Sequence, residues 1–531
     1  MSSPNPTRPW RSLAASAWVF WLLLVTAGLL AAAVLEDGHG WGDDFASYIM
    51  QAQSLVDGRM DEFVAQNRFT IENSNLTLGP VAYPWGTPLL LAPIVVLWGN
   101  DPLALKGLNV ASLLGFLAVL WFGFRPRLSP GWGLLYFLLF AFNPYLYWLL
   151  NQLLSELPFL LFSSLAVLLL RRTVVEERRL IGRSYDRLLL GLLIGLAAAF
   201  RTNGLLLLGT VLLAQAIHNA RAALPAAPRP ETARLTRRRR LFTWLSAARP
   251  ATWKEALVQA LPLLAFGVFS LAWMAVFPDS GLSQFSVFSR IKITTILYHF
   301  YYYFIIPSEF LTPLNHNWLL FAVFAALTAW GILRRARQDY DDFIYCLLTV
   351  GFYIFWPPLQ GLRFLLPIMP LVLLFTFAGL QAGIERLQPE WRRPVERASA
   401  VMLALLVGFF FFTIFQTASH NLQAGRVFND GPYTPATQEV FTFLRQQAAP
   451  GQIAAFIKPR ALRLFTGLKT FASTDPAMLA QADYLVQIAN PGPHPVQQLD
   501  TATLVEWLNQ GRLELLFEAD IFQVYAVRQQ P

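Results

Sequence analysis

Apolar runs of roughly 15 to 23 residues recur along this chain, a length that matches the hydrocarbon core of a bilayer. Charged residues make up only 14% of the 531 residues, whereas a soluble globular domain carries about 25%. The mean hydropathy of +0.44 agrees with this count. The chain is therefore predicted to be an α-helical polytopic membrane protein embedded in a lipid bilayer.

Clusters of basic residues lie between the apolar runs, including the arginine run 237–240 and the pairs at 171–172 and 334–335. Cytoplasmic loops of membrane proteins are enriched in lysine and arginine. This distribution accounts for the net charge of +9, and it argues against a nucleic-acid partner. The first run, 14–35, is predicted to be a retained helix rather than a signal peptide, because its apolar core is long and no A-x-A site precedes a soluble domain.

Orienting the runs by these clusters predicts about 11 membrane helices, or about 13 if the stretches 85–99 and 293–307 also cross. The helices are expected at 14–35, 101–124, 131–149, 155–170, 188–200, 203–218, 257–277, 318–333, 343–356, 364–383 and 399–417. The odd number places the N-terminus in the cytoplasm and the C-terminal region outside it. The membrane is expected to be the inner or plasma membrane of the cell.

The composition changes near residue 421. Residues 1–420 are predicted to form the transmembrane domain, with a first outer loop at 36–100 that contains interfacial helices, and a basic cytoplasmic loop at 219–255. In the last part, "ADYLVQIA" and "LELLFEADIFQVYAVR" alternate apolar and polar residues, which is typical of a strand and a hairpin. Residues 421–531 are therefore predicted to form a small extracytoplasmic α/β domain.

Charged residues that the predicted topology places at the outer face are the candidate functional groups, since charges at membrane depth are costly and mark functional sites. The candidates are Asp43, Asp44, Tyr48, Glu156, Arg201, Arg290, Lys292, His299 and Arg363. A sugar carried on a lipid phosphate needs cations to stabilise the leaving phosphate. An acceptor hydroxyl needs a carboxylate to take its proton. Acids in the first outer loop and bases at other helix ends supply both roles.

Each candidate also has a simpler interpretation. Asp43 and Asp44 can belong to a solvated loop or cap the helix that starts near Phe45, and Glu156 can stabilise a helix start. Arg201 can extend to the membrane interface, and His299 can belong to an aromatic belt. No cofactor is required, but a divalent cation bound by the oxygens of Asp43 and Asp44 stays open as an alternative.

Five motifs in order resemble the GT-C superfamily of polytopic glycosyltransferases, which includes protein O-mannosyltransferases, aminoarabinose transferases and lipopolysaccharide-core galacturonosyltransferases. They are an acidic motif that ends in Tyr48, "YPWGTPLLLAP" at 83–93, "LLSELPFLLFSSLAVLLLRR" at 153–172, "GLLIGLAAAFRTNGLLLL" at 191–208 and "RFLLPIMPLVLL" at 363–374. The resemblance implies polyprenyl-phosphate sugar donors and a catalytic base in the first outer loop. Asp44 is preferred as that base because it precedes Tyr48 in a D-x-x-x-Y spacing, and Asp43 stays the alternative.

The same resemblance implies that Arg201 and Arg363 face the donor phosphate. The leading hypothesis is thus a membrane glycosyltransferase that moves a sugar from a polyprenyl-phosphate donor to a cell-envelope glycan, a lipid or a protein, with inversion at the anomeric carbon. A transporter or lipid flippase is a second hypothesis, and a non-catalytic glycan-binding membrane protein is a third. The C-terminal domain is expected to position the acceptor or to contact a partner.

Overall fold

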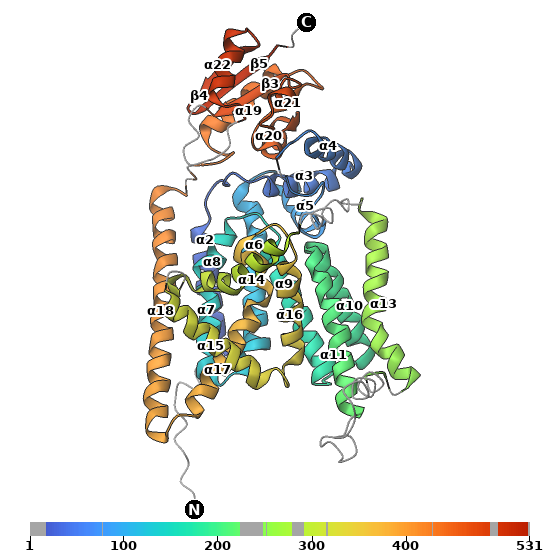
Figure 1. The fold of residues 1–531 in the computed structure, drawn as a ribbon, viewed down its shortest axis with the longest axis vertical. Coiled ribbons are helices and arrows are strands. Elements are labelled where there is room, and N and C mark those ends of the chain that lie inside the picture. The colour runs from blue at the N-terminus through green and yellow to red at the C-terminus, as the bar shows by residue number, and fades with distance from the viewer. Residues whose placement is uncertain are drawn as a thin grey trace, which may run out of the picture.

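The computed structural model describes residues 17–76, 78–223, 248–250, 252–278, 291–314, 317–426, 428, 430–488 and 498–528. A bundle of long helices forms the body of the molecule, and a small domain with a β-sheet sits on one end of it (Figure 1). This arrangement confirms the predicted polytopic helical fold with a C-terminal α/β unit. Most of the predicted basic loop 219–255 lies outside the described residues.

Nine helices in the described part of the chain are long and apolar enough to cross a membrane. The elements that form these spans are α2 (Ala17–Val34), α6 (Pro102–Val119), α7 (Pro130–Ala141), α8 (Pro144–Leu150), α9 (Glu156–Leu170), α11 (Leu206–Ala223), α13 (Trp253–Val276), α15 (Trp318–Arg335), α17 (Met369–Glu385) and α18 (Pro389–Ala424). The apolar runs form helices because backbone N–H and C=O groups inside lipid must be hydrogen-bonded, and a helix bonds them within its own segment. The two other predicted spans correspond to α10 (Arg183–Phe200), which packs on α9 and α13, and to α16 (Tyr340–Ile354), which packs on α11.

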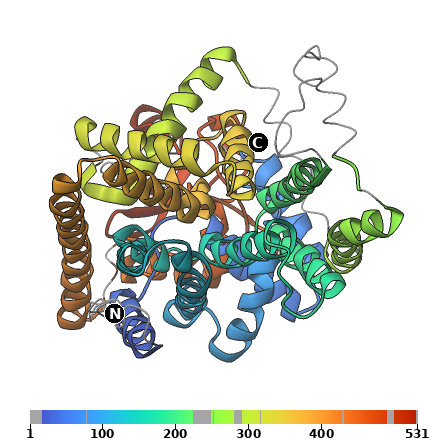
Figure 2. The same cartoon turned by 90° about the horizontal axis from the view of Figure 1, so that it is seen from below.

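Short irregular helices end or connect several of these spans. They are η1 (Leu120–Phe124), η2 (Arg125–Arg127), η3 (Arg171–Val175), η4 (Thr202–Leu205), η7 (Ile306–Leu314), η8 (Gly361–Phe364) and η9 (Leu366–Ile368). Seen along the bundle, α18 stands at its edge beside α2, which it contacts (Figure 2). The last membrane helix thereby returns the chain to the end of the bundle that carries the C-terminal domain.

Two of the ambiguous apolar stretches form short helices. The helices α5 (Gly86–Trp98) and α14 (Ile293–Ile305) have 13 residues each, so each is roughly 20 Å long at 1.5 Å per residue. A bilayer core is about 30 Å thick. The structure therefore favours the smaller of the two predicted helix counts. Two further helices of the first outer loop, α3 (Asp44–Val56) and α4 (Met60–Glu72), lie across the end of the bundle (Figure 1).

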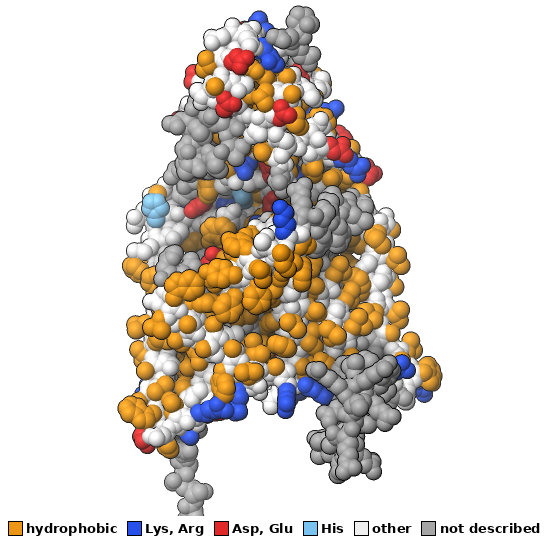
Figure 3. Space-filling view, in the orientation of Figure 1, with side chains coloured by type: hydrophobic (Ala, Val, Ile, Leu, Met, Phe, Trp, Pro, Cys, Tyr) orange, Lys and Arg blue, Asp and Glu red, His pale blue; other side chains and the backbone are white. Residues whose placement is uncertain are grey.

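The surface of the bundle separates by chemistry (Figure 3). On the face shown, apolar side chains form a broad band across its middle, and lysine and arginine side chains gather at the rim away from the C-terminal domain. The bundle also holds a buried ionic cluster made of Arg127, Arg171, Arg335, Asp339, Asp341 and Asp342. In it Arg171 and Arg335 approach Asp339 at 2.7 and 2.6 Å. Such a cluster is stable only while every charge keeps its partners.

The C-terminal domain contains a five-stranded sheet in the order β2-β1-β3-β5-β4. The strands are β1 (Ile453–Ala455), β2 (Lys469–Phe471), β3 (Tyr484–Ile488), β4 (Leu513–Ala519) and β5 (Phe522–Val527), and the helices are α19 (Pro435–Gln447), α20 (Pro459–Thr466), α21 (Pro476–Leu479) and α22 (Thr501–Asn509). Strand β1 pairs with β2 and β3 in parallel, and β5 pairs with β3 and β4 antiparallel. The predicted strand and hairpin are β3 and the β4–β5 pair. Helix α20 points from this domain toward α3 and contacts it.

Candidate functional site

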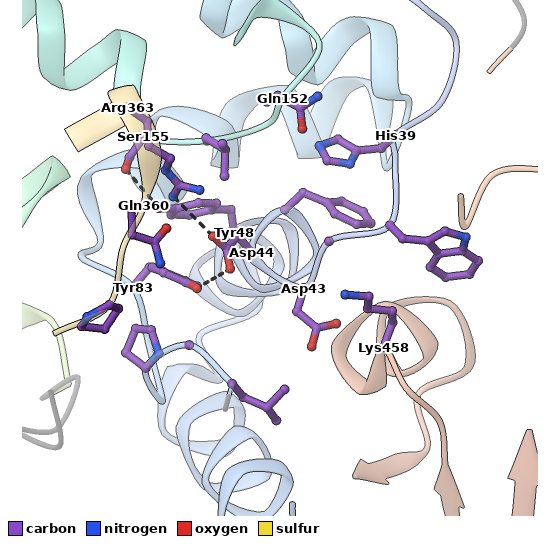
Figure 4. Close-up of a pocket in the computed structure, with 18 of the residues that line it drawn as sticks. His39, Asp43, Asp44, Tyr48, Tyr83, Gln152, Ser155, Gln360, Arg363 and Lys458 are labelled. Atoms are coloured by element: carbon purple, nitrogen blue, oxygen red, sulfur yellow. Dashed lines mark hydrogen bonds and ion pairs between the residues drawn. The ribbon is translucent and has the colours of Figure 1, made fainter. Parts of the chain in front are cut away.

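A cavity of about 880 Å³ lies between the helical bundle and the C-terminal domain. Its walls come from the start of α3, the segment before α5, the starts of α9 and η4, the segment around η8, and the C-terminal domain. Polar residues from several of these elements point into the same space (Figure 4). Of the predicted site residues, those that line it are Asp43, Asp44, Tyr48, Arg201 and Arg363.

Asp44 is the first residue of α3, where the helix dipole favours a negative charge. The hydroxyl of Tyr83 donates a hydrogen bond of 2.5 Å to Asp44 Oδ1. Arg363 Nη2 lies 3.6 Å from Asp44 Oδ2. Burial and the charge of Asp44 keep the pKa of Tyr83 well above its usual value, so the phenol remains a donor. The Asp44 carboxylate is thus fixed by a phenol on one side and a guanidinium on the other.

Asp43 occupies the N-cap position of α3, yet its side chain makes no capping bond to that helix. The backbone N–H of Ala461 in α20 is instead among the groups that lower the pKa of this carboxylate. It points toward Lys458, away from Asp44 (Figure 4). Burial raises the pKa of Asp43 to about 6, against the lowering effect of Arg460 and Lys458. The two neighbouring aspartates therefore serve different walls of the cavity.

Glu156 joins the two arginines that the sequence singled out. Its Oε1 accepts a bond of 2.5 Å from Arg201 Nη1 and one of 2.6 Å from Arg363 Nε. Arg201 follows the last residue of α10, and Arg363 lies in η8, so Glu156 at the start of α9 links three segments. Ser155 Oγ accepts from Tyr48 at 3.1 Å and from Arg201 at 3.4 Å. Charged residues far apart in sequence thus form one network beside Asp44.

The other candidates lie elsewhere. Arg290 is outside the described residues. Lys292 is exposed at the N-cap of α14. His299 is buried within the same helix, and its ring meets Tyr303 edge-on at 6.1 Å. Neither Lys292 nor His299 lines the cavity.

Several lining residues were not assigned from the sequence. Tyr83 and Ser155 lie inside quoted motifs, next to residues that attracted attention for other reasons. Lys458 comes from the C-terminal domain, and no local pattern connects it with the first outer loop. His39 also lines the cavity: its Nδ1–H donates to Gly40 O at 2.8 Å, and its Nε2 accepts from Leu153 N at 3.0 Å. Burial lowers the pKa of His39 to about 4, so the ring is neutral at physiological pH.

The carboxylate pair does not suit a divalent cation. Asp44 accepts a hydrogen bond from the phenol of Tyr83 and lies beside the guanidinium of Arg363, whereas Asp43 is turned toward α20. In the described ranges, no group of three or more histidine, cysteine, aspartate or glutamate side chains could hold a metal ion. Oxygen-ligated cations need several converging oxygens, and these two carboxylates diverge.

No protein-family model and no curated protein sequence matches the chain. Solved structures are similar to it. ArnT from Cupriavidus metallidurans bound to undecaprenyl phosphate has a TM-score of 0.60 at 11% identity, over 96% of this chain and 98% of that one. The apo state of the same protein gives 0.58 at 12% identity, over 97% and 98% of the two chains.

A second kind of structure is also similar. The archaeal oligosaccharyltransferase AglB from Archaeoglobus fulgidus, in complex with an inhibitory peptide and a dolichol-phosphate, has a TM-score of 0.51 at 10% identity, over 90% of this chain and 70% of that one. At such identities the likeness concerns the fold. It confirms the predicted fold, a polytopic helical bundle with a small C-terminal α/β domain.

Proposed function

We propose that this protein transfers a sugar from a polyprenyl-phosphate-linked donor to an acceptor outside the cytoplasm. The observation that carries the proposal is one cavity in which a fixed carboxylate, Asp44, lies beside the arginines Arg201 and Arg363. Undecaprenyl phosphate in ArnT and dolichol-phosphate in AglB are lipid phosphates bound by proteins of this fold. Both the fold and the charges of the cavity therefore support a lipid-phosphate donor.

In the proposed reaction the donor phosphate binds at Arg363 and Arg201, whose orientation Glu156 fixes through two charge-assisted hydrogen bonds. The bond between the anomeric carbon and the phosphate oxygen breaks, and the phosphate leaves with the electron pair. The guanidinium groups stabilise that developing charge. The acceptor hydroxyl attacks the anomeric carbon from the face opposite to the phosphate, and this attack inverts the anomeric centre. The hydroxyl gives its proton to a carboxylate.

Asp44 suits the role of base better than Asp43. The anomeric carbon is joined to the phosphate, so the base must lie close to the phosphate-binding arginines. Asp44 lies 3.6 Å from Arg363, whereas Asp43 faces Lys458 and the first turn of α20 (Figure 4). A base that is already held by Tyr83 needs little reorganisation when the hydroxyl arrives.

We also propose a direction for the molecule in the membrane, and the distribution of its charges supports it. Lysine and arginine gather at the rim away from the cavity (Figure 3), and such rims face the cytoplasm. On this basis the N-terminus is cytoplasmic, and the cavity and the C-terminal domain are extracytoplasmic. The wall that this domain supplies, with Phe456, Lys458 and Ile521, would then position a glycan, lipid or protein acceptor.

The test uses the purified full chain and polyprenyl-phosphate sugars as donors. Asp44→Asn keeps the shape of the side chain and an acceptor for Tyr83, but it removes the base, so transfer should fall by about 100-fold or more. Binding of undecaprenyl phosphate should change little. Unchanged sugar transfer by Asp44→Asn would refute the assignment of Asp44 as the base. A wild type that transfers no lipid-linked sugar but moves a substrate across vesicles would be a transporter.

A further inference from the structure

Arg460, in the first turn of α20, is fully buried although it belongs to the C-terminal domain. Its Nε donates to Asn67 Oδ1 of α4 at 3.1 Å. Its Nη2 donates to the carbonyl oxygens of Gly79 and Pro80 at 3.0 and 2.6 Å. A buried guanidinium is costly unless such acceptors surround it. Arg460 therefore fastens the C-terminal domain to the segment that precedes α5.

That segment leads directly to Tyr83. A Cβ atom on Gly79 would lie 2.1 Å from the Tyr83 hydroxyl and 3.0 Å from Arg460 Nη1, so Gly79 touches both side chains. The Arg460 guanidinium also lies 5.8 Å from the centre of the Tyr83 ring. On the other side, the Tyr83 backbone N–H donates to Gln51 Oε1 at 3.0 Å. The place of Tyr83 is thus set by α3 from one side and by α20 from the other.

Tyr83 is the residue that donates to Asp44 Oδ1, at 2.5 Å. A hydrogen bond donated to a carboxylate stabilises its ionised form and fixes its orientation. We propose that Arg460 is a positioning residue of the site: by holding residues 79–83 it keeps the Tyr83 hydroxyl on Asp44. The inference rests on the proposed role of Asp44 as base. With this role, Arg460 gives the C-terminal domain a direct part in positioning the Asp44 carboxylate.

The first experiment compares Arg460→Gln and Tyr83→Phe with wild type in the full chain. Both should lower transfer by about 10- to 100-fold, the range expected for one hydrogen bond to a charged group. In both variants kcat should fall while KM for the donor stays close to the wild-type value, because neither variant alters Arg201 or Arg363. Since they act through the same bond, the double variant should be no worse than the poorer single variant.

Arg463→Lys is the matched control. Arg463 lies in the same helix and is also buried, but its Nε contacts Met50 Sδ at 3.3 Å and its guanidinium lies over Phe63. This variant should keep the kcat of wild type. Gly79→Ala is a second way to displace Tyr83, because it removes no side chain of α20 and places a Cβ 2.1 Å from the Tyr83 hydroxyl and 3.0 Å from Arg460 Nη1. It should lower kcat as Tyr83→Phe does.

Hydrogen exchange provides a readout that does not depend on activity. Backbone amides of residues 79–83 should exchange faster in Arg460→Gln than in wild type, and Arg463→Lys should leave them unchanged. If wild type transfers no sugar, the proposed function fails while the exchange result still decides whether Arg460 holds this segment. The positioning role is overturned if exchange is unaltered, if Arg460→Gln raises KM for the donor and leaves kcat unchanged, or if its effect adds fully to that of Tyr83→Phe.

Discussion

Glu156 shows at the scale of one residue how the cavity keeps its charges. The side chain is 2% exposed and serves two arginines at once, Arg201 and Arg363. The sequence could single out all three, because isolated charges at the ends of apolar runs are conspicuous. Their pairing could not be predicted, because three different helix ends supply them and no spacing rule relates those ends.

Glu156→Gln should leave the largely buried Arg201 without its counter-charge and Arg363 with only Asp44, 3.6 Å away. Removing one partner of a buried ion pair costs about 3–5 kcal/mol, so the melting temperature of the detergent-solubilised protein should fall. Glu309→Gln is the control, since Glu309 is half-buried and forms no ion pair within the described part of the chain. Equal melting temperatures for the two variants would contradict the account of the network.

Asp43 should make stability depend on pH. Burial raises its pKa from 3.8 to about 6, so the folded protein binds this proton more tightly than the unfolded chain does. The contribution of Asp43 to stability is then present at low pH and is lost as the pH rises through about 4 to 6. Asp43→Asn should lose less thermal stability than wild type between about pH 4 and about pH 6. Identical pH dependence of the two melting temperatures would refute this.

At the scale of elements, helix length and packing decide what the apolar runs become. The long runs were predictable as helices from composition, whereas α5 and α14 were ambiguous because their apolar character equals that of real spans. Tight packing was not predictable. In the α15–α17 pair, a Cβ on Gly331 would lie 1.8 Å from the carbonyl oxygen of Phe375, so the two backbones touch there, as small residues allow between membrane helices.

Gly331→Ala should therefore destabilise the bundle. The added methyl group meets backbone rather than a movable side chain, and overpacking of this kind costs about 1–3 kcal/mol or more. Gly383→Ala is the matched control in α17, where a Cβ would meet nothing within 4 Å. Thermal unfolding in detergent should show a clear loss for Gly331→Ala alone. If Gly383→Ala lowered the melting temperature by the same amount, the loss would not come from the close backbone contact at Gly331, and this account of the packing would be contradicted.

On the scale of the whole molecule, the cavity lies at the boundary between the helical bundle and the C-terminal domain. The first outer loop and the bundle supply Asp44 and the arginines, and these were within reach of sequence reasoning. Arg460 and Gly79 are bonded although they lie 381 positions apart. Polar residues of a small domain carry no periodic signal that reveals such a partner, and for the same reason Lys458 was not assigned. Tyr83 was not assigned because nothing in its motif shows that its hydroxyl meets Asp44.

Lys458 tests whether the C-terminal wall handles the acceptor. It lines the cavity on the side opposite Arg363, next to Asp43 (Figure 4). Lys458→Gln should lower transfer at limiting acceptor and leave the affinity for undecaprenyl phosphate unchanged. Lys469→Gln, at an exposed position of the same domain, should change neither. Weaker binding of undecaprenyl phosphate by Lys458→Gln would place Lys458 with the donor instead.

The most direct test of the central claim is a single turnover of a polyprenyl-phosphate sugar already bound to the protein. Wild type and Asp44→Asn are loaded with equal amounts of labelled donor, and transfer is followed after acceptor is added. Equal loading with a transfer rate lower by about 100-fold or more in Asp44→Asn is the predicted result. Equal loading with equal rates would contradict the assignment of Asp44 as the base.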